Sequence, residues 1–445
     1  MYKCFIRANI GDIHYLHNDM DMRLNETDVH CQALEHLGLV ASVIQSTGLI
    51  GRIDARIPVS KAKGAKLTVG QRITAMILNG LGFTNDRLYM FPSFLEDKPV
   101  SRLFGEDVEA TDFNDDSLGR ALDYIYEYGA THLFSELAFD IGQQEGLLGA
   151  SAHFDTTSLS LYGEYEPEVI IDDTKPQSNH FVPEEQRTPI EITHGFSKAN
   201  RPDLKQVVLT LATTGAANYP IWMEGCSGNA SDKRVLQASA QRMQDFCKQL
   251  KNTPSFLYVG DSAMYERCVK EAADLLWLSR VPERLNEAKK WIRKPDADYS
   301  WTELGNGYRM TALTEAAYGD VLQRWILIHS EQACHREKKT LQKHINKEAE
   351  AIKKLLWHTG NQVFACETDA LKAGKEAVKK LKYHQVSWKI NAIEKRTKPG
   401  KPKPGAPLIT VGYRLIGTSD VDEESVTEAL QEKGRFILAS RGRVE

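Results

Sequence analysis

Apolar residues recur three and four positions apart through the first third of the chain, which is the period of an amphipathic helix. Three stretches between His30 and Ala138 show this period: ALEHLGLVASVIQSTGLIGRID, TVGQRITAMILNGLGF and DDSLGRALDYIYEYGATHLFSELA. Thr68 stands where an N-cap of the second stretch is expected. The pattern predicts an all-α domain over residues 30–140, preceded by an extension of uncertain order over residues 1–29.

The pattern changes near Gly149. The segments ASAHFDTTSLSLYG, KQVVLTLATTG and YPIWMEGC are rich in β-branched and aromatic residues and predict three strands. SFLYVGDS and LLWLSRVP predict two further short strands, and CVKEAADL predicts a helix between them. SDKRVLQASAQRMQDFCKQL predicts a helix capped by Ser231, with one apolar face formed by Val235, Met243, Phe246 and Leu250. Residues 149–282 therefore predict a mixed α/β sheet layered with helices.

Residues 283–440 have a different residue pattern. WILIHSEQACHREKKTLQKHINKEAEAIKKLLWH and DALKAGKEAVKKLKYH predict two antiparallel amphipathic helices. Their inward side chains are expected to be Leu341, Ile345, Ile352, Leu355, Leu371, Val378 and Leu381. HQVSWKINAIEK and LITVGYRLIGTS predict a strand pair joined by the basic loop KRTKPGKPKPGAP, and GRFILAS predicts a last strand.

Composition narrows the class of protein. The chain has 445 residues, of which 42% are hydrophobic and 26% charged, as in a soluble globular protein of two or three domains. No apolar run reaches the roughly 18–20 residues that a membrane span requires, so no membrane partner is expected. The seven cysteines are scattered without a paired C-x-x-C spacing, and the N-terminus lacks a secretory pattern. These features predict a cytoplasmic protein.

Charge is distributed unevenly along the chain. The net charge of −4 combines +10 from Glu283 to Gly405, where 25 Lys and Arg meet 15 Asp and Glu, with −14 elsewhere. A basic segment of this kind suits either a solvated helical face or contact with nucleic acid. The charge by itself does not decide between these two interpretations.

Two aspartates lie where catalytic or metal-binding carboxylates are expected. Asp155 lies within AHFDTTS, and a carboxylate inside an otherwise apolar strand is costly unless it is paired or binds a metal. Asp261 in YVGDSAMY lies at the C-terminal end of the fourth strand, the edge where α/β sheets place functional groups. If neighbouring strands bring the two together, their repulsion favours a divalent cation such as Mg²⁺. Two such ions ~3.5–4 Å apart would clamp the attacking and leaving oxygens of a phosphodiester displacement.

Both aspartates also have structural interpretations. Asp261 could cap the helix that follows, and Asp155 could accept hydrogen bonds from Thr156, Thr157 or a turn. His153 shares the strand face of Asp155 and is interpreted as a packed histidine rather than a ligand.

A second polar cluster, ITHGFSKANRPDLKQ, contains Lys198, Arg201 and Lys205. It suits either a phosphate backbone or a turn with solvated charges. SGNASD is interpreted as a turn with a helix cap. The chain has no Walker-type loop, G-x-S-x-G elbow, H-E-x-x-H or Rossmann glycine fingerprint, which argues against NTPase, α/β-hydrolase, zincin and dehydrogenase chemistry.

Taken in order, these segments resemble the DDE transposases of bacterial insertion sequences, in the branch whose RNase H-like core is interrupted by a β-rich insertion. The similarity runs from about Leu34 to Leu438. It rests on LEHLGLVASVI, ILNGLGFTNDRLYMFPSFLEDKPVSRLFG, HFDTTSLS, HGFSKANRPDLKQ, SGNASD, VGDSAMY, LLWLSRVPERLNEAK and GRFILAS.

The resemblance implies an α/β fold: an RNase H-like mixed sheet core, its first part at 149–282, with an all-α N-terminal domain at 30–140 and a basic α+β insertion at 283–440. Asp155 and Asp261 match the family's first two catalytic carboxylates and would bind Mg²⁺ or Mn²⁺. The implied reaction is cleavage at transposon ends followed by attack of the freed 3′-hydroxyl on target DNA. The implied partners are double-stranded DNA and, in the active form, a second copy in a homodimer, in the cytoplasm at the nucleoid. The residues expected to contact DNA are Lys198, Arg201, Lys205, Lys398, Lys401 and Lys403.

The C-terminus departs from the family pattern. The family's third carboxylate is a glutamate within Tyr-x-x-Arg-x-x-x-Glu, and none of the 16 tyrosines here has Arg at the third position after it. Glu445 belongs to no such helix and is not assigned the role. The expectation is a truncated copy without the closing catalytic helix, which would bind metal weakly and cleave slowly or not at all.

Three hypotheses follow. The first is an Mg²⁺-dependent enzyme that uses Asp155 and Asp261. The second is a DNA-binding transposase remnant without catalysis, and the third is a structural protein that oligomerises through its helical hairpin.

Overall fold

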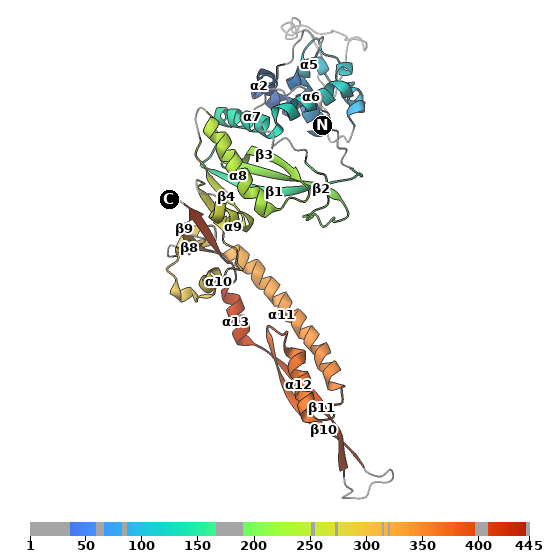
Figure 1. Ribbon diagram of the computed structural model, residues 1–445, viewed down its shortest axis with the longest axis vertical. Coiled ribbons are helices and arrows are strands. Elements are labelled where there is room, and N and C mark those ends of the chain that lie inside the picture. The colour runs from blue at the N-terminus through green and yellow to red at the C-terminus, as the bar shows by residue number, and fades with distance from the viewer. Residues whose placement is uncertain are drawn as a thin grey trace, which may run out of the picture. The chain divides into compact units, whose positions relative to one another are not determined.

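The fold was obtained as a computed structural model that describes residues 36–58, 66–81, 87–165, 190–250, 254–271, 275–313, 316–318, 321–396 and 408–441. The chain divides into two compact units, residues 1–259 and 260–445 (Figure 1). The fold is mixed α/β, with a large mixed sheet and many helices, as the hydrophobic pattern predicts. The extension expected over residues 1–29 lies outside the described residues.

The first unit begins with a helical region. Its helices are α1 (Leu37–Ser46), α2 (Leu49–Arg56), α3 (Val69–Leu81), α4 (Phe91–Leu95), α5 (Val100–Phe104), α6 (Asp115–Tyr128) and α7 (Ala130–Gln144), with 3-10 turns η4 (Leu88–Met90) and η5 (Ala110–Asp112). One apolar core gathers around Phe91, Phe113 and Leu118, and a second joins Ile53 of α2 to Leu133 of α7. The segments whose apolar residues have a helical spacing therefore form helices, as predicted.

Thr68 caps α3, as predicted. Its Oγ1 accepts a hydrogen bond from the Gln71 backbone N at 3.1 Å, and the Gln71 side chain accepts one from the Thr68 backbone N at 2.8 Å. This reciprocal pair satisfies two backbone donors that the first turn of a helix leaves free.

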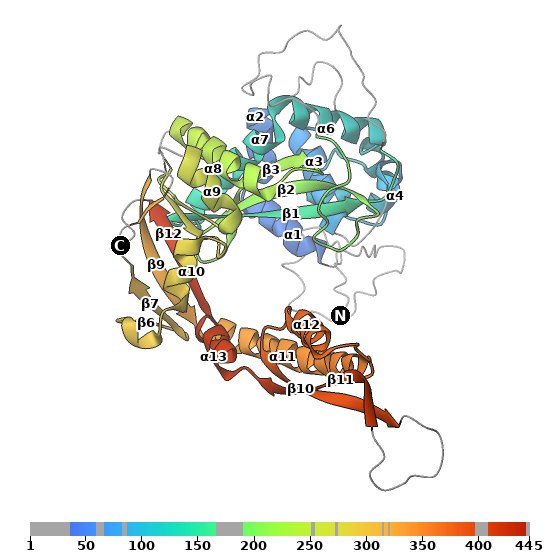
Figure 2. The ribbon, with the colours of Figure 1, turned by 60° about the horizontal axis from the view of Figure 1, so that its bottom comes forward.

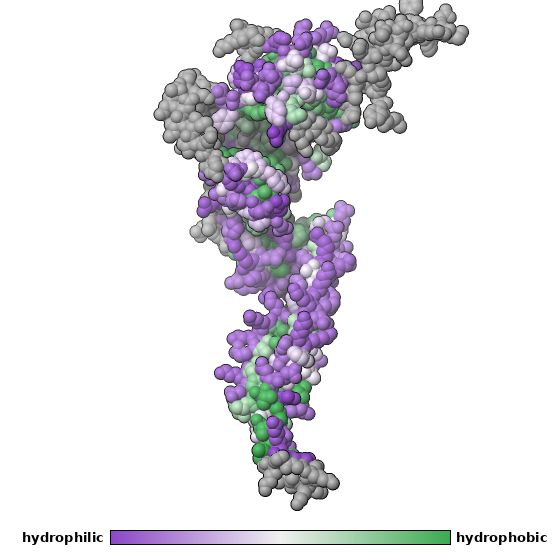
Figure 3. Space-filling view, turned by 90° about the vertical axis from the view of Figure 1, so that its right-hand side faces the viewer, coloured by the Kyte–Doolittle hydropathy of each residue, from purple (hydrophilic) through white to green (hydrophobic). Residues whose placement is uncertain are grey.

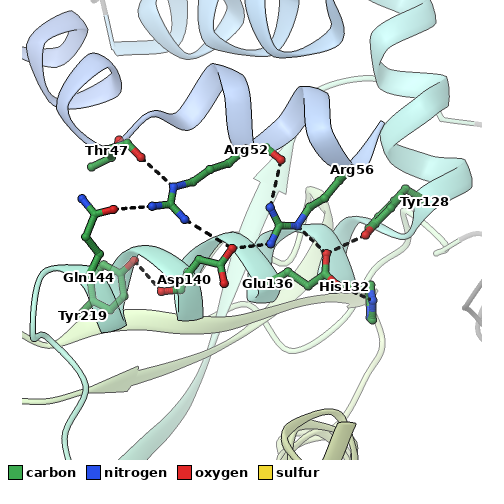
Figure 4. A network of polar contacts seen from close by, with 10 residues as sticks. Thr47, Arg52, Arg56, Tyr128, His132, Glu136, Asp140, Gln144 and Tyr219 are labelled. Carbon is green, nitrogen blue, oxygen red and sulfur yellow. Dashed lines mark hydrogen bonds and ion pairs between the residues drawn. The ribbon is translucent and has the colours of Figure 1, made fainter. Parts of the chain in front are cut away.

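A polar network holds α2 against α7 (Figure 4). Arg56 donates to Glu136 at 2.8 Å and to Asp140 at 2.5 Å. Tyr128 donates its hydroxyl to Glu136 at 2.7 Å, and His132 lies 3.4 Å from the same carboxylate. Charge-assisted bonds of this kind fix the two helices in one register.

The sheet of the first unit has the strand order β3-β2-β1-β4. Its strands are β1 (Ser151–Leu161), β2 (Lys205–Thr214), β3 (Tyr219–Ser227) and β4 (Leu257–Gly260). β1 and β3 run antiparallel to β2, whereas β4 runs parallel to β1. All four strands lie where the sequence predicts strands.

Two helices pack on this sheet. α7 meets β3, where the Tyr219 hydroxyl donates to the Ala138 carbonyl oxygen at 3.0 Å. α8 (Asp232–Gln249) lies beside α7, with the Phe139 and Phe246 rings 5.9 Å apart, and Trp222 of β3 packs on Phe246 at 5.8 Å. An aromatic core therefore fills the space between the helices and the strands.

Two details of α8 differ from the prediction. Ser231 occupies the N-cap position, but its side chain makes no capping hydrogen bond. Leu236 and Ala240 join Met243 and Phe246 in the core, whereas Val235 is only half-buried. The buried positions follow a helical period that starts one residue later than predicted.

The second unit contains an antiparallel group of strands in the order β5-β12-β9-β7-β6, with β8 also paired to β9. They are β5 (Trp277–Arg280), β6 (Thr302–Gly305), β7 (Tyr308–Ala312), β8 (Ala316–Tyr318), β9 (Val321–Ser330) and β12 (Arg435–Arg441). The helices α9 (Ser262–Glu271) and α10 (Asn286–Arg293) and the turn η7 (Asp296–Asp298) accompany them. β5 and β12 lie where strands are predicted.

The run WILIHS was predicted as the start of a long helix, and this is wrong. It belongs to β9, in which Gln323, Trp325 and Leu327 are buried at alternate positions. β9 pairs with β7 on one side and β12 on the other. β12 is distant in sequence from β9, so local periodicity did not reveal this pairing. The helical pattern of the residues that follow WILIHS also hid the boundary between strand and helix.

Between β9 and β12 the chain leaves the sheet and returns, and residues 331–434 are called the insertion below. It comprises α11 (Glu331–Gly360), α12 (Glu367–Val378), β10 (His384–Arg396), β11 (Leu408–Val421) and α13 (Glu423–Gln431). Because Arg435 pairs opposite His329, the insertion begins and ends at neighbouring strands. β6 to β9, which follow Glu283, belong to the sheet, so the insertion defined here is shorter than the predicted segment 283–440.

Inside the insertion, β10 and β11 form the predicted antiparallel pair, and α11 and α12 pack along it (Figure 2). Leu341, Ile345 and Ile352 of α11 are buried, as predicted. Leu371 was expected to point inward but is exposed. The contact face of α12 is instead made by Ala370 and Gly374, because small residues let the helix approach the strands closely.

Candidate active site

Asp155 lies on the exposed face of β1. Ala152, Phe154 and Thr156 alternate as buried residues, which places His153 and Asp155 on the opposite face. The Asp155 side chain is 87% exposed, so the expected desolvation cost does not arise. His153 is also exposed rather than packed, and its Nε2 lies 2.9 Å from Ser151 Oγ.

The structural interpretation of Asp155 holds in part. Its Oδ1 accepts a hydrogen bond from the Thr156 backbone N at 2.7 Å. A carboxylate has about four acceptor sites, so this bond leaves capacity for a cation or a further donor.

Lys198 joins the Asp155 site from the loop before β2. Its ammonium group donates to the Thr156 carbonyl oxygen at 2.5 Å and to Thr156 Oγ1 at 2.8 Å. The same group lies 3.9 Å from an Asp155 oxygen and 3.5 Å from an Asp232 oxygen. The structure therefore brings one predicted DNA-contacting residue beside the first predicted carboxylate.

Asp232 is a site residue that sequence reasoning missed. It is the first residue of α8, and its Oδ1 accepts a hydrogen bond from Thr156 Oγ1 at 2.8 Å. The only signal was its place in SGNASD, which was interpreted as a turn with a helix cap. Its neighbours Thr156 and Lys198 come from segments far away in sequence, so no local pattern could reveal the cluster.

Close backbone contacts position the loop that carries Lys198. The buried Gln206 side chain donates to the Gly228 carbonyl oxygen at 2.8 Å and to the Phe196 carbonyl oxygen at 3.3 Å. A Cβ at Gly195 would lie 2.0 Å from the Gly228 oxygen, and one at Gly228 would lie 2.0 Å from the Gln206 oxygen. The segments HGFSK, KQ and SGN therefore meet at a point that only glycine allows.

Arg201 and Lys205 lie in the same loop region but are held by other partners. Arg201 donates to both Asp203 oxygens, at 2.8 and 2.6 Å, and to the Tyr162 hydroxyl at 3.2 Å. The bonds to Asp203 and Tyr162 raise the pKa of Arg201, and the Arg201 guanidinium lowers the pKa of Asp203. Lys205 donates to the Glu164 and Tyr165 carbonyl oxygens. Both residues thus tie the loop to the end of β1.

Asp261 follows β4 directly and belongs to the second unit. Its Oδ1 accepts a hydrogen bond from the Ala263 backbone N at 2.8 Å, so the interpretation as a helix cap is confirmed. Its carbonyl oxygen accepts a bond from Ser279 Oγ at 2.6 Å. Because Asp261 caps α9, that helix begins at Ser262, earlier than the predicted start at Cys268.

The donor chemistry at Asp155 fits a hard divalent cation. Mg²⁺ is held through one or two carboxylates together with water and phosphate oxygens. An exposed carboxylate meets that requirement, and Lys198 offsets the repulsion between Asp155 and Asp232. Among the described residues, no group of three or more His, Cys, Asp or Glu side chains is arranged to hold a metal ion.

Several predicted residues lie outside the described residues. They are Lys398, Lys401 and Lys403 of the basic loop, and Glu445. In the part of the chain that the structure describes, no helix is long and apolar enough to cross a membrane.

Comparison with known proteins gives one match. A family model described as a domain of unknown function (DUF4277) matches residues 29–139, the helical region of the first unit. That family is often found in transposases. No curated protein and no solved structure matches the chain.

Proposed function

We propose that the chain is a DDE-type DNA transposase of an insertion sequence, with an RNase H-like core in which Asp155 and Asp261 are the first two catalytic carboxylates. The observation that carries the proposal is the parallel register of β1 and β4, in which His153 is opposite Val259. Asp155 and Asp261 each follow two residues later in the sequence, and this equal spacing from the register supports their proposed role as the first two carboxylates. The match of the helical region to a domain family common in transposases supports the same class.

The proposed reaction has two steps on double-stranded DNA. In the first, water attacks a phosphorus atom at the element end, the bond from phosphorus to O3′ breaks, and O3′ receives a proton. In the second, the freed 3′-hydroxyl attacks a phosphorus atom of target DNA and displaces another 3′-oxygen. A divalent cation, Mg²⁺ or Mn²⁺, would polarise the phosphate and lower the pKa of the attacking water when bound.

The chain's own residues have distinct proposed roles. Asp155 and Asp261 would hold the cations. Lys198 offsets the charges of Asp155 and Asp232 and so keeps both carboxylates on one side of the site. Asp232 accepts a hydrogen bond from the Thr156 hydroxyl and thereby fixes β1 next to Asp155. Asp232 and Thr156 are therefore positioning residues.

The proposed partners follow from the chemistry. Double-stranded DNA supplies the element ends and the target, and a homodimer would hold two ends at once. The proposed place of action is the nucleoid in the cytoplasm.

The direct test is cleavage of DNA that carries the ends of the chain's own element. We expect Mg²⁺-dependent nicking that disappears with EDTA, with Asp155→Asn and with Asp261→Asn, while all variants keep wild-type circular dichroism. Asp245→Asn is the matched control, because this exposed aspartate of α8 pairs only with neighbouring side chains on its own helix. Wild-type protein that leaves such DNA intact with both Mg²⁺ and Mn²⁺, or nicking that survives both active-site substitutions, would refute the proposed activity.

The second candidate function is DNA binding without cleavage. The observation that favours it is that the described residues contain no group of three metal-ligating side chains. In that case Asp155→Asn would leave DNA affinity unchanged, wild-type protein would not nick, and binding would still weaken with salt.

A further inference from the structure

α11 exposes a row of basic side chains within the insertion. Its members, called the basic stripe below, are Arg336, Lys339, Lys343, Lys347 and Lys354, and all are exposed. At 100° per residue their spacing of three, four, four and seven places them within an arc of about 80° on one side of the helix. The row covers about 27 Å along the helix axis at ~1.5 Å per residue.

The stripe lies on the side of α11 that faces away from the rest of the insertion. The buried residues Leu341, Ile345 and Ile352 define the opposite side, which packs on the strand pair. Figure 3 shows hydrophilic residues over most of the visible face of the insertion. The basic side chains are therefore directed to solvent and not to the core.

Two acidic side chains of α11 accept hydrogen bonds from backbone N–H groups of other segments. Glu337 accepts a hydrogen bond from the Gly434 backbone N at 3.0 Å. Glu348 accepts bonds from the Lys382 and Tyr383 backbone N atoms at 2.9 and 2.8 Å.

Glu350 is the one carboxylate on the stripe side of α11, and it pairs with Lys353 at 2.7 Å. Among the described residues, Lys339, Lys343 and Lys347 have no ion-pair partner. A solvated helical face ordinarily mixes charges of both signs. On the stripe side of α11, the described charges without an ion-pair partner are therefore positive.

We propose that the basic stripe binds the phosphate backbone of double-stranded DNA, an inference that rests on the proposed function and adds a second DNA contact to it. Lysines one helical turn apart are about 6 Å from one another, and each DNA strand presents a phosphate every ~3.4 Å of helix axis. Long side chains bridge this difference, so three or more phosphates are contacted. Contact of this kind is independent of base sequence and sets the position of the duplex.

The test compares two triple variants of the full chain. Lys339→Gln, Lys343→Gln and Lys347→Gln together remove three stripe charges. Lys66→Gln, Lys248→Gln and Lys290→Gln together remove the same charge from exposed lysines outside α11 that each pair with an acidic side chain. Fluorescence anisotropy with a labelled duplex of mixed sequence, in EDTA so that cleavage does not occur, gives the dissociation constant at several salt concentrations.

We expect the stripe variant to lose ~100-fold or more in affinity near ~0.1 M salt, and its slope of log affinity against log salt to fall by ~2–3. The control variant should lose less than ~5-fold, because its lysines are neutralised locally. Equal losses in the two variants, or no change in the salt slope of the stripe variant, would overturn the inference. Binding of duplex RNA in preference to the matched DNA would overturn it as well.

The two proposals fail in distinguishable ways. Loss of binding confined to the stripe variant, in a protein that never nicks DNA, upholds the stripe and refutes the cleavage proposal. Normal binding by the stripe variant of a protein that does nick DNA refutes the stripe alone.

Discussion

Glu136→Gln is expected to destabilise the helical region of the first unit in a pH-dependent way. Burial raises the pKa of Glu136, but hydrogen bonds from His132, Tyr128 and Arg56 outweigh burial and lower the pKa from 4.5 to about 2. The charged carboxylate is therefore stabilised more in the folded state than in the unfolded state.

The magnitude follows from that pKa. A fall from 4.5 to about 2 corresponds to ~3 kcal/mol without screening. The Glu136 side chain is 24% exposed, and solvent screening reduces the figure to about 1–2 kcal/mol. Because the folded-state pKa is lowered, this stabilisation is complete above about pH 4.5 and is lost as the pH falls toward 2.

Hydrogen exchange followed by mass spectrometry measures the effect locally in the full chain. The opening free energy of α2 and α7 peptides should fall by about 1–2 kcal/mol in the variant at pH 7, and the difference from wild type should shrink at pH 3. Glu127→Gln, an exposed carboxylate of α6, is the control and should change little. An equal loss at both pH values would show that the charge of Glu136 is not the cause.

Three further substitutions test the packing. Gly228→Ala places a Cβ 2.0 Å from the Gln206 carbonyl oxygen, so we expect a loss of about 1–3 kcal/mol in thermal unfolding and slower nicking. Gly434→Ala combines a φ of +78° with a Cβ 2.6 Å from the Cys334 Cβ, and should cost about 1–3 kcal/mol and speed proteolysis where the insertion meets the sheet. Glu348→Gln should cost about 1–2 kcal/mol in urea unfolding at pH 7. Burial raises the pKa of Glu348, but its bonds from His384 and two backbone N atoms lower it overall, so this loss too should diminish below pH ~4.5.

Gly119→Ala is the matched control for both glycine substitutions. A Cβ at Gly119 of α6 meets no atom within 4 Å, so alanine should be neutral or stabilise the helix by up to ~1 kcal/mol. If Gly228→Ala behaved like Gly119→Ala, the close approach of the two loops would not matter. Wild-type proteolysis rates for Gly434→Ala would likewise contradict the strain argued for the return from the insertion.

Secondary structure was largely accessible from the sequence because its signals are local. The alternation in ASAHFDTTSLSLYG predicts β1, and the Thr68 cap marks the start of α3. The errors fall where a distant partner decides the outcome. WILIHS became a strand because β7 and β12 flank it, and Leu371 is exposed because Gly374 brings another face of α12 to the strands.

The same distinction between local and long-range information applies to the candidate site. Asp155 was predicted from its place inside a strand, Asp261 from its place at the end of a strand, and Lys198 from a polar cluster, and their roles stay predictions. Asp232 was missed, because only the fold brings the start of α8 against Thr156. The supposed desolvation of Asp155 was wrong, since a carboxylate in an apolar strand is still exposed when its face of the sheet is open.

By itself the sequence determined most of the helices and strands and the basic character of the segment that contains the insertion. These depend on periodicity and composition, which act over a few residues. The tertiary structure alone decided that Lys198 stands between Asp155 and Asp232 and that β12 joins β9 after the insertion. It also decided that Glu337 and Glu348 of α11 accept hydrogen bonds from backbone N–H groups of other segments. Those outcomes depend on contacts between residues far apart in the chain, and no local pattern encodes them.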